Sequence, residues 1–169
     1  MHFQRFTIDD EVLLKAQVAA AEEAFSVARG SGDKPVQLRS AIALANMLIT
    51  ARREREATGI LASVERLART ETTEALGWWL LYFGTAEQYL DDRSSAQQRF
   101  NEALRLAQDL RLRSLESYVL HHMGRCYVED GEIDLARAAF QRALELREAL
   151  DDPRKASTRR ALDALVAEG

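Results

Sequence analysis

The feature that most constrains this chain is an order of small and large residues that recurs after 40 residues. The recurring positions are Gly84, Ala96, Phe100 and Ala103, and then Gly124, Ala136, Phe140 and Ala143. Glycine and alanine permit two helices to cross closely, and a phenylalanine fills the space beside them. Gly131 lies between the two halves of the second copy, where a tight turn needs a residue that tolerates positive φ. Asp91 takes this place in the first copy. The interval therefore predicts pairs of helices joined by short turns.

A weaker copy lies one interval further upstream. It keeps the order of small and large residues but has neither the glycine nor the aromatic residue. Its members are Ala41, Leu44, Ala45, Leu48, Ala57, Leu61 and Val64. The turn expected near Arg52 and Arg53 carries no residue that favours a turn. Further back, Ala21, Phe25 and Ala28 repeat the second-helix half alone.

One stretch of the second copy also carries a family resemblance. The residues concerned are Leu120, Met123, Gly124 and Tyr127, followed by Ala136, Phe140 and Ala143. Their order resembles the tetratricopeptide repeat, a helix–turn–helix unit with the signature W-x2-L-G-x2-Y followed by A-x3-F. The upstream copy departs from it at Glu87, which stands where the tyrosine would be. The long period is similar to a subclass found in signalling scaffolds and in the regulatory ends of bacterial transcription activators.

The resemblance implies an all-α fold, a right-handed superhelix of antiparallel helix pairs with a C-terminal capping helix. We expect one domain over 1–169, with an N-terminal helix over 8–29 and the capping helix over 153–167. A cap for the first helix is expected within Thr7–Asp10. The repeats are expected over 35–70, 72–111 and 112–150, with helices over 35–51, 54–69, 72–90, 93–110, 113–129 and 132–150. A closed helical bundle is the structural alternative, but it does not predict a spacing that recurs at a fixed interval.

Composition restricts the class of protein. The 169 residues carry a formal net charge of −4, and both signs are mixed along the expected helices. Because no basic stripe is present, we expect no nucleic-acid partner. No apolar run is long enough for a signal peptide or a membrane span, so we expect no membrane partner. The single cysteine, Cys126, rules out an internal disulfide and favours a reducing cytoplasm. The start at Met1 and the final helix favour a free-standing small protein, with a fragment as the alternative.

In the repeat family the first helix of each pair lines a concave groove, which is the usual binding face. Helical spacing places ten candidate ligand-binding residues on this stripe: Arg39, Asn46, Trp78, Tyr82, Thr85, Tyr89, Tyr118, His121, His122 and Arg125. Leu81 belongs to the same stripe, whereas Trp79 and Phe83 are expected in the core. Aromatic side chains with a polar tip near an arginine are typical of recognition surfaces. The alternative is that these aromatic residues pack against adjacent helices, the last helix or a second copy.

His121, His122 and Cys126 suggest a metal site, but a zinc site needs three or four ligands. Only His2 remains elsewhere, so we expect no metal and interpret Cys126 as a small buried hydrophobic residue. No glycine-rich phosphate loop or GxSxG sequence is present. Carboxylate pairs stand at expected turns, where they act as helix caps. We therefore expect no catalytic residues, no cofactor and no enzyme.

The remaining hypotheses concern binding. The first is an adaptor that holds a protein or peptide segment in the concave groove. The second is a structural scaffold whose aromatic stripe or end helix forms a homodimer. The family resemblance adds a third, a peptide-sensing regulatory protein that acts through a partner. A monomer that binds a ligand would favour the first hypothesis, and a stable dimer with a closed groove would favour the second.

Overall fold

The computed structural model describes residues 3–6, 8–70 and 73–167, with the side chains of 166 and 167 excepted, and these residues form helices and no strands. The helices are α1 (Glu11–Ser31), α2 (Lys34–Thr50), α3 (Glu54–Ser63), α4 (Glu65–Thr70), α5 (Glu74–Tyr89), α6 (Arg93–Asp109), α7 (Arg113–Glu129), α8 (Ile133–Ala149) and α9 (Lys155–Ala167). The expected all-α class is therefore confirmed. Within the described residues, no helix has the length and apolar character that a membrane crossing needs.

Helix ends agree with the expected ranges best in the second half of the chain. The bounds of α6, α7 and α8 lie within one residue of those expected from the spacing. At the N-terminus, Asp10 caps α1, because its carboxylate accepts a hydrogen bond from the backbone N–H of Leu13. Thr7 and Thr72, which belong to an expected cap and an expected helix start, lie outside the described residues.

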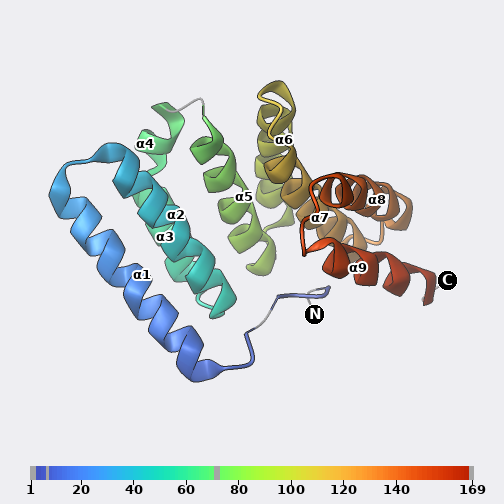
Figure 1. Cartoon of the computed structure of the whole chain (residues 1–169), viewed down its shortest axis with the longest axis horizontal. Helices are drawn as coiled ribbons and strands as arrows, with labels where there is room; N and C mark the ends of the chain where they lie inside the picture. Colours follow the sequence, from blue (N-terminus) through green and yellow to red (C-terminus); the bar gives the residue numbers. More distant parts are fainter. Residues whose placement is uncertain (1–2, 7, 71–72, 168–169) are drawn as a thin grey trace.

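The helices pack mainly with their neighbours in the sequence (Figure 1). Contacts join α1 to α2, α2 to α3, α5 to α6, α6 to α7, α7 to α8 and α8 to α9. A second set joins the first helices of successive pairs, because α2 packs on α5 and α5 packs on α7. The faces of α2, α5 and α7 are thus brought next to one another, although these helices are separated in the sequence.

Five helix ends share one turn geometry. A residue with positive φ stands at Arg52, Asp91, Arg111, Gly131 and Asp151. In each turn the next N–H donates to the carbonyl five residues back, as from Asp92 to Glu87 at 3.0 Å and from Glu132 to Tyr127 at 2.8 Å. This is the Schellman arrangement, which satisfies the last carbonyls of a helix. The last four turns are 20 residues apart, so one helix and its turn take half of the repeat.

Two glycines allow the helix pairs to approach closely. A Cβ atom on Gly124 would lie 2.7 Å from Cε1 of Phe140, and one on Gly84 would lie 2.8 Å from Cε1 of Phe100. Both phenylalanine rings are fully buried. The ring of each second helix therefore rests directly on the backbone of the first helix, and the close crossing expected from the sequence is confirmed.

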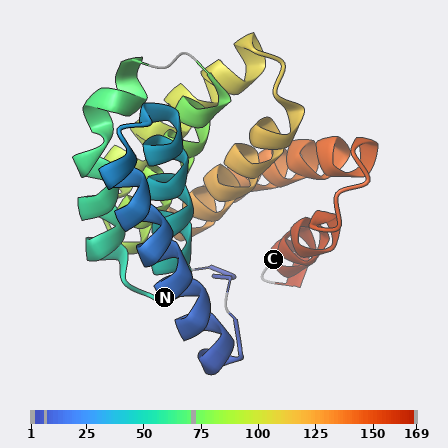
Figure 2. The same ribbon diagram turned by 60° about the vertical axis from the view of Figure 1, so that its left-hand side comes forward.

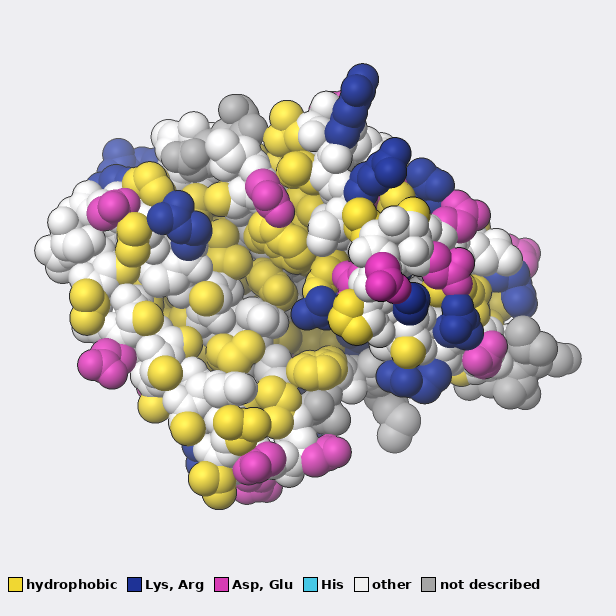
Figure 3. All heavy atoms as spheres, in the orientation of Figure 1, with side chains coloured by type: hydrophobic (Ala, Val, Ile, Leu, Met, Phe, Trp, Pro, Cys, Tyr) yellow, Lys and Arg dark blue, Asp and Glu magenta, His cyan; other side chains and the backbone are white. Residues whose placement is uncertain are grey.

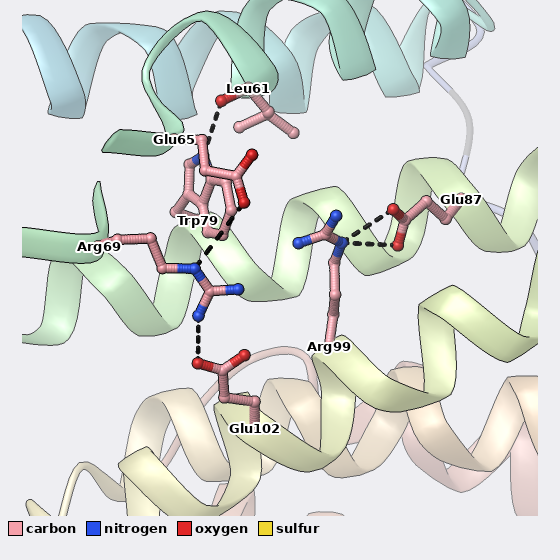
Figure 4. Close-up of polar contacts among 7 residues, drawn as sticks. All are labelled: Leu61, Glu65, Arg69, Trp79, Glu87, Arg99 and Glu102. Atoms are coloured by element: carbon pink, nitrogen blue, oxygen red, sulfur yellow. Dashed lines mark hydrogen bonds and ion pairs between the residues drawn. The ribbon is translucent and has the colours of Figure 1, made fainter. Parts of the chain in front are cut away.

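The helix expected over 54–69 is interrupted, which corrects the prediction. Val64 donates to the carbonyl of Leu61 at 3.2 Å, three residues back, and a new helix begins at Glu65. The indole Nε1 of Trp79 donates to the same Leu61 carbonyl at 3.0 Å (Figure 4). In a continuous helix this carbonyl would accept from the N–H four residues on. The buried indole replaces that bond and so permits the break.

The Trp79 indole also connects three helices through charged neighbours (Figure 4). The guanidinium groups of Arg69 and Arg99 lie 5.2 and 5.3 Å from the indole centroid. Arg99 in turn donates from Nε to both carboxylate oxygens of Glu87 at 2.8 Å, and Arg69 pairs with Glu102. Burial raises the pKa of Glu87, while the Arg99 hydrogen bond acts in the opposite direction. Trp79 thus ties α4, α5 and α6 together.

The last helix packs an apolar face against α8. Ala161 and Leu165 are buried beside Ala136 and Phe140, and Leu162 is half-buried at the same contact. Because this contact includes the Phe140 ring, α9 completes the environment of the residue that the Gly124 crossing depends on.

Replacing Gly124 with leucine is expected to destabilise the fold, because any side chain there meets the buried Phe140 ring. Overpacking of this kind costs about 1–3 kcal/mol of unfolding free energy. Gly59→Leu is the matched control, since a Cβ at Gly59 meets nothing within 4 Å and leucine favours the helix. Thermal unfolding followed by circular dichroism compares the two. A Gly124→Leu chain as stable as the control would contradict the crossing.

Candidate functional site

A hollow lined by hydrophobic side chains separates the α2–α5 side of the molecule from the α7–α9 side (Figure 3). Contacts of α5 with both α2 and α7 place these three helices along it. An open pocket of about 280 Å³ lies at one end of the hollow. Its lining residues are Arg39, Ile42, Thr73, Glu74, Ala75 and Trp78.

Three half-buried aromatic side chains form a cluster beside this pocket: Trp78, Tyr82 and Tyr118. The rings of Trp78 and Tyr82 are stacked with centroids 6.1 Å apart, and Tyr118 meets Trp78 edge-on at 5.0 Å. The guanidinium groups of Arg147 and Arg154 lie 5.1 and 5.0 Å from the Tyr118 centroid. Burial raises the pKa of Tyr82 to about 12, so its hydroxyl stays neutral. The cluster therefore offers flat apolar surface with neutral hydroxyls and a positive edge.

Helical spacing decides which aromatic residues belong to this cluster. Trp78 and Tyr82 are four residues apart on α5 and therefore share a face. Trp79 and Phe83, one position further along, point into the core with exposed fractions of 0% and 7%. The separation of a core pair from a hollow-lining pair within one helix is therefore confirmed.

The middle of the hollow holds two histidines with hydroxyl partners. Nδ1 of His122 lies 3.1 Å from Oγ1 of Thr85, and Nδ1 of His121 lies 3.2 Å from Oγ1 of Thr158 on α9. Burial lowers the pKa of both histidines well below the ordinary value, and the neighbouring arginines lower it further. The expectation that they change charge near neutral pH is therefore wrong, because both are neutral there. Thr85 is buried between the helices and lines no open surface.

The far end of the hollow is covered by the N-terminal segment, which we define as residues 3–6. Arg125 is only 2% exposed, and its Nε donates to the backbone carbonyl of Phe3 at 2.8 Å. Tyr89 is buried beneath Arg5, whose guanidinium lies 4.1 Å from the ring centroid. The sequence placed Arg125 in an open groove with its guanidinium turned to an external carboxylate. This was wrong, because the side chain is enclosed and already bonded within the chain.

The predicted site residues thus fall into separate groups. Arg39, Trp78, Tyr82 and Tyr118 gather at the pocket end, with Arg39 exposed. Asn46 is half-buried on α2, where its backbone carbonyl accepts from the Thr50 hydroxyl at 2.9 Å. Leu81, which was expected on the same stripe, is fully buried in the core.

Arg147 is a residue of the hollow that sequence reasoning missed. It is 2% exposed, and its Nη1 donates to Oγ1 of Thr158 at 2.5 Å and to the carbonyl of Arg154 at 3.2 Å. A signal was present, because Arg147 follows Ala143 by four residues and so continues the buried stripe of α8. Burial lowers the pKa of its guanidinium, but arginine stays charged even so.

The cysteine and the histidines show no arrangement for metal binding. Cys126 is 1% exposed, and burial raises the pKa of its thiol to about 12. It therefore stays protonated and packs in the main core, as a small hydrophobic residue does. In the part of the chain that the structure describes, no group of three or more His, Cys, Asp or Glu side chains could hold a metal ion.

Comparison with known proteins identifies a shared fold. No family model matches the sequence, and no curated protein matches it. Among solved structures, the crystal structure of BtubC (BKLC) from P. vanneervenii is similar to this chain, with a TM-score of 0.74 at 17% sequence identity. The match covers 92% of this chain and 66% of BtubC. At this identity the likeness establishes the helical fold alone.

The neutral histidines predict a stability that falls at acid pH. Their folded pKa lies below the ordinary value of 6.5, so the unfolded chain binds more protons as the pH drops past that value. The contribution is fully present above this pH and is lost as the pH falls. We expect the melting temperature to decrease between about pH 7 and pH 5, and to decrease less in a His121→Gln/His122→Gln chain.

The double variant isolates the histidines from other acid titrations. Glu87, whose pKa is raised, favours the folded chain at low pH and so acts in the opposite direction. Because both chains retain Glu87, its effect cancels in the comparison. The same loss of melting temperature in both chains would contradict the assignment to His121 and His122.

Proposed function

We propose that this protein is an adaptor built as a tetratricopeptide-like stack of helix pairs, and that it binds a protein or peptide segment in its hollow. The observation that carries the proposal is the cluster of Trp78, Tyr82 and Tyr118 beside an open pocket of about 280 Å³. Half-buried aromatic side chains with polar tips are typical anchors of a binding surface. A merely solvated helix face would carry charged residues instead.

The regularity of the helix pairs supports the proposed stack. The turns at Asp91, Arg111, Gly131 and Asp151 recur every 20 residues, and both glycine crossings recur every 40. Regular stacking of such pairs produces an extended concave surface. The fold that this chain shares with BtubC is consistent with this arrangement.

The charges around the pocket suggest the chemistry of the bound segment. Arg39 is exposed at the pocket, and Arg154 lies over the outer ring of the cluster. The ligand we propose has an apolar side chain that contacts Trp78 and an acidic group that pairs with one of these arginines. The Tyr82 hydroxyl, which is neutral, supplies a further hydrogen-bonding group.

A second candidate function is self-association through α1. Its outer face carries exposed apolar side chains at Val12 and Val27, with exposed fractions of 79% and 68%. Exposed apolar groups at the end of a helix stack favour contact with another surface. Sedimentation of the wild type and of a Val12→Ser/Val27→Ser chain tests this function. It predicts a dimer that the two substitutions dissociate, and a monomeric wild type contradicts it.

Trp78→Ala is expected to weaken segment binding by about 2 kcal/mol, roughly thirtyfold in Kd, if Trp78 is an anchor. Peptides selected from a displayed library on the wild-type chain supply the ligand, and calorimetry supplies the Kd. Leu110→Ala is the matched control, since Leu110 is an exposed apolar residue at the end of α6. Both variants should melt near the wild-type temperature. Peptides that bind the Trp78→Ala chain as tightly as the wild type would contradict the proposal.

A further inference from the structure

The N-terminal segment crosses the ends of the three helices that line the hollow. Figures 1 and 2 show this part of the chain running from α9 past the lower end of α5 to the start of α1. Its bonds reach residues 44 to 156 positions away in the sequence. Phe3 and Arg5 make most of these contacts, whereas Phe6 is 67% exposed.

Phe3 is held by both its backbone and its ring. Its N–H donates to Oε1 of Glu129 at 3.0 Å, and its carbonyl accepts from Nε of Arg125 at 2.8 Å. Its ring lies 6.1 Å from that of Phe140 and packs on the apolar contact between α8 and α9. Side chains of α7 that bind both polar groups of one residue, next to a place for an aromatic ring, are what recognition of a peptide requires.

Arg5 is held at the other end of the segment by three different interactions. It donates to the backbone carbonyl of Ile49 at 2.6 Å, forms an ion pair with Glu54, and lies 4.1 Å over the Tyr89 ring. The side chains of Arg5 and Glu54 are only 10% and 11% exposed. The carbonyl belongs to the last turn of α2, where the helix dipole favours a cation. Lysine could not match the stacking and the forked donation of arginine here.

No helix pair depends on this segment. The main core is formed by residues from α1 to α7, and Phe3 is only partly buried at a smaller contact. If the segment left, Arg125 and Glu54 would each lose a hydrogen-bonding partner in an enclosed place. Such a loss is costly unless another group replaces it. The site therefore favours any segment that supplies the same groups.

We propose that this end of the hollow is a peptide-binding site for an aromatic residue followed two positions later by an arginine, and that Phe3 and Arg5 are its resident ligand. A partner segment with this pattern displaces the chain's own segment. The inference rests on the proposed function, because it names a kind of segment that the hollow accepts. It concerns the end of the hollow away from Trp78.

The first test uses the full chain and a fluorescein-labelled synthetic peptide, MHFQRFTIDD, which has the sequence of residues 1–10. A short tether keeps the resident segment at an effective concentration of about millimolar, so the probe should bind a Phe3→Ala/Arg5→Ala chain at least about tenfold more tightly than the wild type. Fluorescence anisotropy measures both affinities. The matched control is a probe with the same two alanines, which should not bind. A folded double variant that binds both probes alike would overturn the proposal.

Substitutions in the body of the protein locate the probe. Glu54→Gln, added to the double variant, should weaken probe binding at least about tenfold, because it removes the charge that pairs with arginine. Trp78→Ala, added instead, should leave probe binding unchanged. Failure of the proposed function would appear as an unaffected library ligand, and failure of this inference as an unbound probe. The two failures are thus distinguishable.

A second measurement uses the wild-type chain and does not depend on the folding of a variant. A probe with benzoylphenylalanine at its first aromatic position is added at about millimolar concentration, to compete with the tethered segment. Light should crosslink it to α7, α8 or α9, as digestion and mass spectrometry would reveal. Crosslinks elsewhere, or equal yield with the alanine probe, would overturn the site. A wild-type dimer in which residues 3–6 of one copy occupy the other copy would overturn the partner assignment.

Discussion

The contact between a helix glycine and a phenylalanine ring is the constraint on which the arrangement of the second half of the chain depends. At Gly84 and at Gly124 a Cβ atom would lie within 3 Å of the ring on the following helix. With no side chain in the way, the two helices approach until the ring meets backbone, and the ring becomes fully buried. Because the crossing recurs after 40 residues, α7 repeats the orientation of α5 and the two helices pack side by side.

That repetition brings the same face of successive helices into one hollow. Tyr118 of α7 reaches Trp78 of α5, and His122 of α7 reaches Thr85. The contents of the hollow then change along its length. At one end aromatic rings flank an open pocket, whereas at the other end Arg125 is enclosed beneath residues of the N-terminal segment. A single helix spacing therefore yields an exposed binding surface and an occupied one.

Buried positive charge also distinguishes the hollow. Arg125 and Arg147 are each 2% exposed, and both lower the pKa of His121 and His122. Desolvation and these charges act in the same direction, so the histidines are neutral and serve as hydrogen-bonding partners of Thr85 and Thr158. Tyr118, with two guanidinium groups near its ring, shows how aromatic faces accommodate cations that carboxylates do not neutralise directly.

The sequence by itself determined the helices, most of their ends and the residues at the close crossings. These features depend on local spacing, on the small residues and on turn chemistry, as Gly131 and Asp91 illustrate. It also separated Trp78 from Trp79, because adjacent positions on a helix face different directions. Even Arg52, with no turn signal of its own, follows the same turn geometry, since the helix end rather than the residue type requires it.

Only the tertiary structure decided which parts of the predicted groove stay open. Arg125 and Tyr89 are covered because Phe3 and Arg5 return to them from more than 80 residues away, and helical spacing carries no information about such a contact. The break at Val64 likewise depends on the Trp79 indole, which takes a carbonyl of a helix that precedes it in the chain. Long-range hydrogen bonds and burial set these features, and a stripe of residues on one helix does not encode them.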